Sequence, residues 1–155
     1  MKNQRMLDEL TELMRIDVSS GQEMEIADCL AAKLEQMGFS ITRDEAGATF
    51  GGVCGNVLAV REGERDSVVC FCSHMDRVPG GIGIKPVEED GILRSSGDTI
   101  LAADDLSGVA AILEGVRQAI ESGKALPKLE ILFTVGEEAG LYGACLLYTS
   151  DAADD

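Results

Sequence analysis

The chain has 155 residues and a net charge of −15, from 28 acidic and 13 basic side chains. With 45% hydrophobic and 26% charged residues it has the composition of one ordinary globular domain, which excludes a disordered or collagen-like protein. Because the negative field repels phosphates and anionic lipids, we expect no nucleic-acid partner and no membrane partner. No apolar run approaches the ~18 residues of a membrane span, and the N-terminus does not resemble a signal peptide, so the predicted location is cytoplasmic.

The first forty residues predict two helices. Apolar side chains recur at helical spacing over about residues 4–16. A second helix is expected over about 22–37, with Ser20 and Glu23 at the spacing of a capping box and Gly38 at its end.

Strands and one more helix follow in chain order. Apolar runs and turn residues predict strands over 39–42, 56–60, 68–72 and 129–135, a hairpin over 82–95 and a helix over 105–122. The apolar run at 68–72 is continuous, which is typical of a strand covered on both faces. Helices alternating with such strands predict a layered α/β domain.

The five cysteines are odd in number and show no framework spacing, so we expect reduced thiols. Cys70, Cys72 and His74 alternate along one strand and allow a thiol–imidazole pair. Cysteines in strands are more often small core residues, and that interpretation is preferred.

Metal-type ligands gather at three element ends. They are His74 with Asp76, Asp104 with Asp105, and Glu137 with Glu138. Each pair also has an ordinary explanation: a surface histidine, a helix N-cap or a solvated turn. Two of the pairs directly follow apolar strands, where α/β sheets place their sites. Imidazole and carboxylates together suit a divalent cation, and the combination favours a metallohydrolase.

Three segments resemble motifs of the co-catalytic zinc peptidases, the family of peptidase T, carboxypeptidase G and acetylornithine deacetylase. Residues 72–79 (CSHMDRVP) are similar to the family's His-Met-Asp-Thr-Val segment, 97–105 to its bridging-aspartate motif and 134–140 to its paired-glutamate motif. Residues 84–93 are most similar to the peptidase T branch. Ala102 stands where the family commonly has glycine.

The resemblance implies a role for each matching residue. His74 would bind one zinc ion and Glu138 the other, with Asp104 bridging the two. Asp76 would orient His74, and Glu137 would act as general base on a metal-activated water. The implied fold is the N-terminal part of a three-layer helix–sheet–helix catalytic domain of a zinc exopeptidase. The implied substrate is a short peptide, with tripeptides cut from the amino end expected. A zinc amidohydrolase of N-acyl amino acids and a non-catalytic relative are the alternatives.

The resemblance also implies parts that this sequence does not contain. Family members have another acidic ligand, a last histidine, and a lid domain that allows a homodimer. We therefore expect residues 1–144 to be the N-terminal part of the catalytic domain, with weak metal binding and little or no catalysis in this chain alone. Residues 145–155 resemble one reading frame of a sequencing adapter, and we expect them to be a non-native tail.

Overall fold

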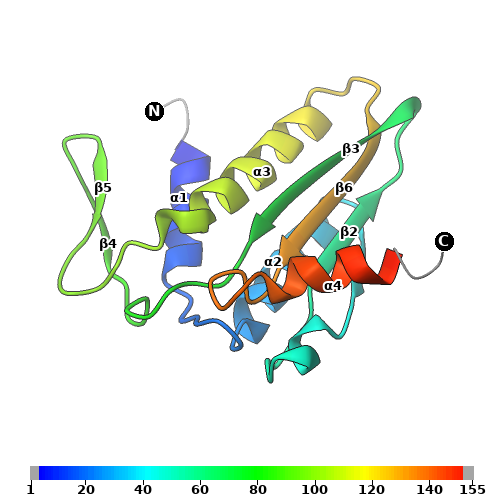
Figure 1. Ribbon diagram of the computed structural model, residues 1–155. Coiled ribbons are helices and arrows are strands. Elements are labelled where there is room, and N and C mark those ends of the chain that lie inside the picture. Colours follow the sequence, from blue (N-terminus) through cyan, green and yellow to red (C-terminus); the bar gives the residue numbers. More distant parts are fainter. Residues whose placement is uncertain (1–3, 152–155) are drawn as a thin grey trace.

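The computed structural model describes residues 4–151, which form a mixed sheet covered by helices on one face (Figure 1). The elements in chain order are α1 (Gln4–Met14), α2 (Met24–Gln36), β1 (Ser40–Arg43), the 3-10 helix η1 (Ala46–Thr49), β2 (Val57–Arg61), β3 (Arg65–His74), β4 (Pro86–Glu89), β5 (Ile92–Ser95), α3 (Ala103–Glu121), β6 (Pro127–Thr134) and α4 (Tyr142–Asp151). The predicted helices, strands and hairpin are therefore confirmed within a few residues.

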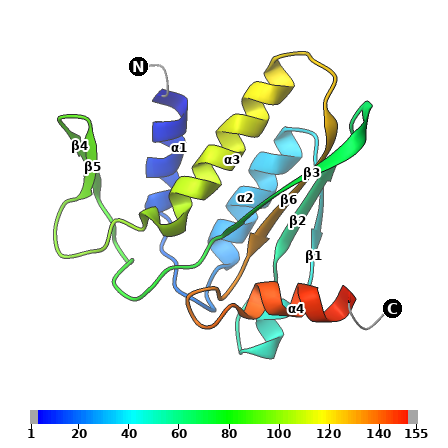
Figure 2. The same ribbon diagram turned by 45° about the horizontal axis from the view of Figure 1, so that its top comes forward.

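The main sheet has the strand order β1-β2-β6-β3. Strand β3 runs parallel to β6, whereas β2 is antiparallel to β6 and to β1. The parallel pair brings the carboxyl ends of β3 and β6 to one edge, with His74 opposite Thr134. The amino end of β2 reaches the same edge, because Val57 pairs with Phe133. Strands β4 and β5 form a separate hairpin that projects from the body (Figure 2).

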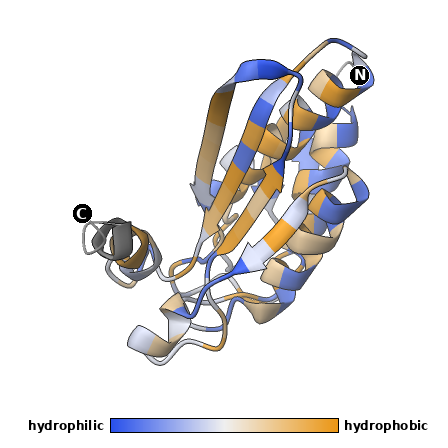
Figure 3. Cartoon of the chain, turned by 90° about the vertical axis from the view of Figure 1, so that its right-hand side faces the viewer, coloured by the Kyte–Doolittle hydropathy of each residue, from blue (hydrophilic) through white to orange (hydrophobic). Residues whose placement is uncertain are grey.

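Helices α1, α2 and α3 lie together on one side of the sheet, and α4 lies on the opposite side near one end (Figure 3). The core fills the space between the three helices and the sheet, with Leu30, Leu113 and Phe133 fully buried. Helix α1 is also tied to its neighbours by charge: buried Glu9 accepts a hydrogen bond from Arg117 at 2.8 Å. This arrangement is the α/β fold expected for the N-terminal part of the catalytic domain.

The predicted capping box of α2 is wrong. Residue Glu23 does precede the helix, but no side chain caps it. The Ser20 hydroxyl donates instead to Asp76, and the Glu23 carboxylate accepts N–H groups of Gly21 and Gly136. Both side chains are directed to the carboxyl ends of β3 and β6, where the buried N–H of Gly136 needs an acceptor and the buried carboxylate of Asp76 needs donors. The predicted end of the helix is confirmed, since Gly38 has a φ of +86°.

The expected burial of residues 68–72 on both faces is also wrong for the described part of the chain. Strand β3 is an edge strand, and Val68, Val69 and Phe71 are all exposed. The strand forms where the apolar run predicts it, but no described element lies beyond it. Among residues 4–151, no helix combines the length and apolar character needed to cross a bilayer. The expected tail starts within α4, its last four residues lie outside the described part, and its origin stays a prediction.

Candidate metal centre

The site lies where β3 and β6 end side by side. The N–H of Met75 donates to the carbonyl oxygen of Thr134 at 3.0 Å, which extends the strand pairing past His74. The chain then leaves β3 through Asp76 and leaves β6 through Gly136. Parallel strands therefore deliver two of the three predicted acidic or imidazole pairs to the same place.

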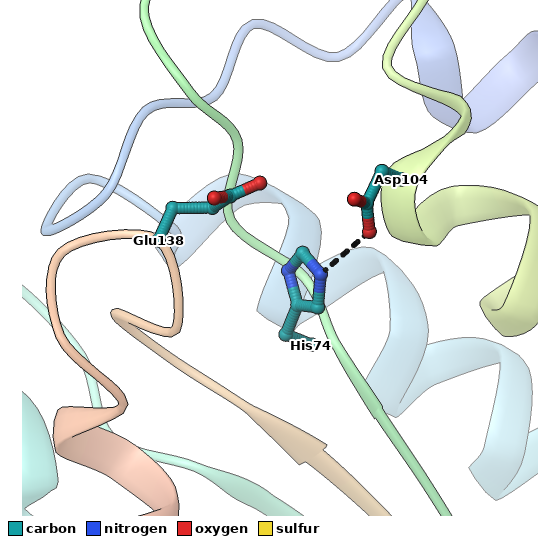
Figure 4. Close-up of side chains that lie close together, drawn as sticks. All are labelled: His74, Asp104 and Glu138. Atoms are coloured by element: carbon teal, nitrogen blue, oxygen red, sulfur yellow. Dashed lines mark hydrogen bonds and ion pairs between the residues drawn. The ribbon is translucent and has the colours of Figure 1, made fainter.

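His74 lies between the carboxylates of Asp76 and Asp104, and Figure 4 shows its contact with Asp104. Its Nε2 atom is 3.1 Å from Oδ1 of Asp104, and its Nδ1 atom is 3.3 Å from Oδ1 of Asp76. The second contact has the distance of an ion pair but lacks the alignment of a hydrogen bond. The carboxylate of Asp76, and then that of Asp104, raise the pKa of His74 to about 9 despite its partial burial.

The adjacent acids of the second pair have different roles. Asp105 accepts the N–H of Gly108 at 3.1 Å and the hydroxyl of Ser73 at 2.8 Å, so it caps the regular part of α3. The side chain of Asp104 is 85% exposed and is directed at His74. The capping explanation thus holds for one acid, which leaves the other for the site. A cis peptide bond joins the two, and Ala102 before them has a φ of +59°, a region that favours glycine.

Asp76 is the most connected side chain of the site, and it is 1% exposed. It accepts the hydroxyl of Ser20 at 2.5 Å and the N–H groups of Glu137 and Glu138 at 3.0 and 3.1 Å. Burial by itself would raise the pKa of Asp76, but His74 and these donors outweigh it and lower the pKa. Asp76 therefore stays ionised and holds the glutamate turn against the end of β3.

The third pair, Glu137 and Glu138, adds two carboxylates to the site. Glu138 directs its carboxylate toward His74 and Asp104 (Figure 4). Desolvation raises the pKa of Glu138, and the negative charges of Glu137, Asp104 and Asp76 add to the effect against the opposing charge of His74. The carboxylate of Glu137 is near enough to raise the pKa of His74 as well. Such a concentration of negative charge favours a cation.

The residues present fit a divalent metal ion. His74, Asp104 and Glu138 each offer one ligand atom, and these atoms lie within 4.8 Å of one another. Imidazole and carboxylates together suit a divalent cation. A carboxylate beside the second ring nitrogen is the usual partner of a metal-binding histidine, and Asp76 is in that position. All five sequence-predicted site residues therefore lie in one region.

Sequence reasoning missed three side chains that support the site: half-buried Ser20 and the buried Glu23 and Asn56. The first two were assigned to a helix cap. The available signal was the presence of Ser20 and Glu23 in the short connection between α1 and α2. It could not identify their partners, which lie far away in the sequence.

Comparison with known proteins settles the family. The profile of peptidase family M28 matches residues 56–154, which include all five predicted site residues. The chain belongs to this peptidase family. In Bacillus subtilis (strain 168), the uncharacterized protein YqjE is 37% identical over 145 residues, which are 93% of this chain and 39% of that protein.

Two solved structures are similar over nearly the whole chain. Aminopeptidase PepT from Bacillus cereus ATCC 10987 gives a TM-score of 0.88 at 37% identity, with 92% of this chain and 39% of that chain covered. A tripeptidase from Staphylococcus aureus gives 0.85 at 35% identity, with the same coverage of 92% and 39%. The expected resemblance to the peptidase T branch is confirmed, and the chain spans 39% of the length of these relatives.

Proposed function

We propose that the protein carrying this chain is a zinc-dependent exopeptidase that hydrolyses short peptides, with tripeptides cut from the amino end as the preferred substrates. The observation that carries the proposal is the group formed by His74, Asp104 and Glu138, with Glu137 beside it. The similarity to proteins named aminopeptidase and tripeptidase supports the substrate class.

The resemblance to the co-catalytic zinc peptidases implies a role for each residue, and the proximity of the side chains supports it. His74 and Glu138 would hold one zinc ion each, and the exposed carboxylate of Asp104 would be shared by both. When bound, zinc polarises a carbonyl group and makes water more acidic. Glu137 is not among the three clustered ligands, so its carboxylate is free to take a proton from the attacking water and to pass it to the leaving amine.

Asp76 acts through His74 and the glutamate turn. Its carboxylate keeps Nε2 of His74 directed at Asp104, because it attracts the proton on Nδ1. It also receives the N–H groups of both glutamates. We therefore assign it an orienting role in the proposed reaction.

The described residues supply two ligands for each of two zinc ions, whereas three protein ligands are usual at a catalytic zinc. We therefore propose that the chain of 155 residues alone binds zinc weakly and has little or no activity. Peptidase activity of the purified chain that depends on added zinc would contradict this part of the proposal.

Substituting Glu137→Gln in the full-length protein tests the mechanism. We expect kcat for tripeptides to fall about 10²–10⁴-fold, as for the loss of a general base, while the zinc content is unchanged. Glu130→Gln is the matched control, since that side chain pairs with Lys128 on β6 away from the site. An unchanged kcat in Glu137→Gln would contradict the general-base role of Glu137, whereas no activity in the unsubstituted full-length protein would favour the non-catalytic alternative. A panel of tripeptides and N-acyl amino acids then separates the exopeptidase from the amidohydrolase.

A further inference from the structure

The connection between β6 and α4 carries both glutamates of the site, yet it belongs to neither element. Side chains from elsewhere hold it. Asn56 holds its two ends, accepting the N–H of Val135 at 3.1 Å and donating to the carbonyl oxygen of Gly143 at 3.0 Å. Asp76 accepts the N–H groups of Glu137 and Glu138. Backbone hydrogen bonds close the later part of the connection, where Gly140 and Leu141 both donate to the carbonyl oxygen of Glu137. The N–H of Gly136, the residue that begins the turn, has a different kind of partner.

That donor, the N–H of Gly136, is bound by Glu23 at 3.1 Å. The same Oε1 atom accepts the N–H of Gly21 at 2.8 Å, so one carboxylate oxygen joins the segment before α2 to the turn after β6. Three consecutive N–H groups, those of residues 136–138, are thus received by two buried carboxylates.

Apart from its bonds to the N–H groups of Gly21 and Gly136, the side chain of Glu23 has no partner among the described residues. Its side chain is 0% exposed, it takes part in none of the ion pairs found among the described residues, and its Oε2 atom has no hydrogen-bond partner there. Burial raises the pKa of Glu23, and the nearby charge of Asp76 adds to the effect. Burying a carboxyl group without a cation costs stability, and the N–H groups of Gly21 and Gly136 offset part of that cost.

Gly136 is held from its other side as well. Its φ is +61°, and a Cβ atom there would lie 2.6 Å from the ring of Phe50. The ring of Phe50 in turn stacks on Tyr142 with centroids 4.8 Å apart. Packing on one side and a carboxylate on the other fix the direction in which the chain enters the turn.

We propose that Glu23 is a positioning residue for Glu137 and Glu138, because it holds the N–H of Gly136 and thereby sets the turn from which both side chains project. The consequence for catalysis rests on the proposed function, but the effect on the turn and on metal binding does not. Glu23 touches neither substrate nor metal in this proposal.

Two readouts on the chain of 155 residues test it: amide hydrogen exchange of Gly136 by NMR, and titration with Co²⁺ followed by its absorption spectrum. In Glu23→Ala we expect Gly136 to exchange about tenfold faster and Co²⁺ affinity to fall about fivefold to tenfold, as for the loss of one buried hydrogen bond. Glu23→Gln should keep both properties close to wild type. Its amide oxygen still accepts the two N–H groups, and its NH₂ replaces an oxygen that has no partner.

Glu9→Ala is the matched control, since Glu9 is another buried glutamate but pairs with Arg117 and Lys33 far from the turn. It should lower the free energy of unfolding and leave both readouts unchanged. If Glu23→Ala does not fold, Glu23→Asp replaces it, because the shorter side chain withdraws the acceptor and must show the same two losses.

Wild-type exchange and Co²⁺ affinity in the variant that withdraws the acceptor would overturn the proposal. Equal losses in Glu9→Ala would overturn it too, because they would show a general effect of stability. If the full-length protein hydrolyses no peptide while both readouts still change as expected, the proposed function fails and the positioning role stands.

Discussion

Strands β3 and β6 are neighbours with similar apolar sequences and opposite degrees of burial. In β6 the residues facing the helices are buried, with Ile131 and Phe133 at 0% exposure. In β3 the corresponding side chains are open, and Phe71, whose Cα pairs with that of Ile131, is 38% exposed. A hollow of about 560 Å³ lies between β3 and α3, lined by Phe71, Gly115 and other mostly apolar residues. An apolar run thus predicts a strand suited to burial, but neighbouring elements must supply the cover.

At their carboxyl ends the two strands have similar surroundings, because each is held by the other. There the hydrogen bond from Met75 to Thr134 continues the pairing, and polar side chains find partners on both segments. The geometry of the site depends on this pairing of β3 with β6 and on the loops that follow it. It does not depend on cover for the exposed apolar part of β3. Three predictions test the contrast, from the largest expected effect to the smallest.

Truncating one phenylalanine in each strand compares the two environments directly. We expect Phe133→Ala to lower the free energy of unfolding by about 3–5 kcal/mol, because it leaves a cavity in a closed core. Phe71→Ala should cost less than about 1 kcal/mol, because its ring is already partly in water. Urea denaturation of both variants at one pH measures the difference. Similar losses would show that β3 is covered in solution.

Proton release on metal binding tests the arrangement at the carboxyl ends. The metal-free chain holds the proton of His74 up to about pH 9, against an ordinary pKa of 6.5. The stabilisation from this proton is therefore fully present below pH 6.5 and is lost as the pH rises through about 9. Since zinc needs a neutral imidazole, binding at pH 7 should release about one proton from His74, and fewer as the pH approaches 9.

Calorimetry in two buffers with different ionisation enthalpies counts these protons. Asp76→Asn is the informative variant, because it removes the first cause of the raised pKa of His74 and should reduce the release at pH 7. Equal proton release in the wild type and in Asp76→Asn would contradict the contact between Nδ1 of His74 and the carboxylate of Asp76.

Introducing a charged residue on the exposed edge strand β3 should have the smallest effect on stability. Val68 is 57% exposed on β3, so Val68→Lys should change the free energy of unfolding by less than about 0.5 kcal/mol. It should nevertheless reduce self-association, because lysine on an edge strand opposes pairing with another chain. Analytical ultracentrifugation over a range of concentrations measures this effect. Val53→Lys, at an exposed loop position, is the control and should leave association unchanged.

Prediction from the sequence worked best where neighbouring residues decide the structure. The hairpin turn, the end of α2 at Gly38 and the strand 129–135 follow from local backbone preferences and apolar runs. The roles of Ser20 and Glu23 could not be predicted in this way. Their spacing fits a cap, but their actual partners lie 56 and 113 residues away in the sequence.

The sequence by itself predicted most of the elements and the side chains that gather at the site: His74, Asp104 and Glu138, which could hold a metal ion, with Glu137 beside them. This was possible because the end of a strand and the type of a ligand residue can both be recognised from a few neighbouring residues. Only the tertiary structure decided that Asp105 caps α3 while Asp104 faces the histidine, and that Glu23 holds the glutamate turn. It also showed that, among the described residues, β3 is an exposed edge strand. These outcomes depend on which distant segments meet, because a buried N–H group or an apolar face takes its partner from whatever the fold brings next to it.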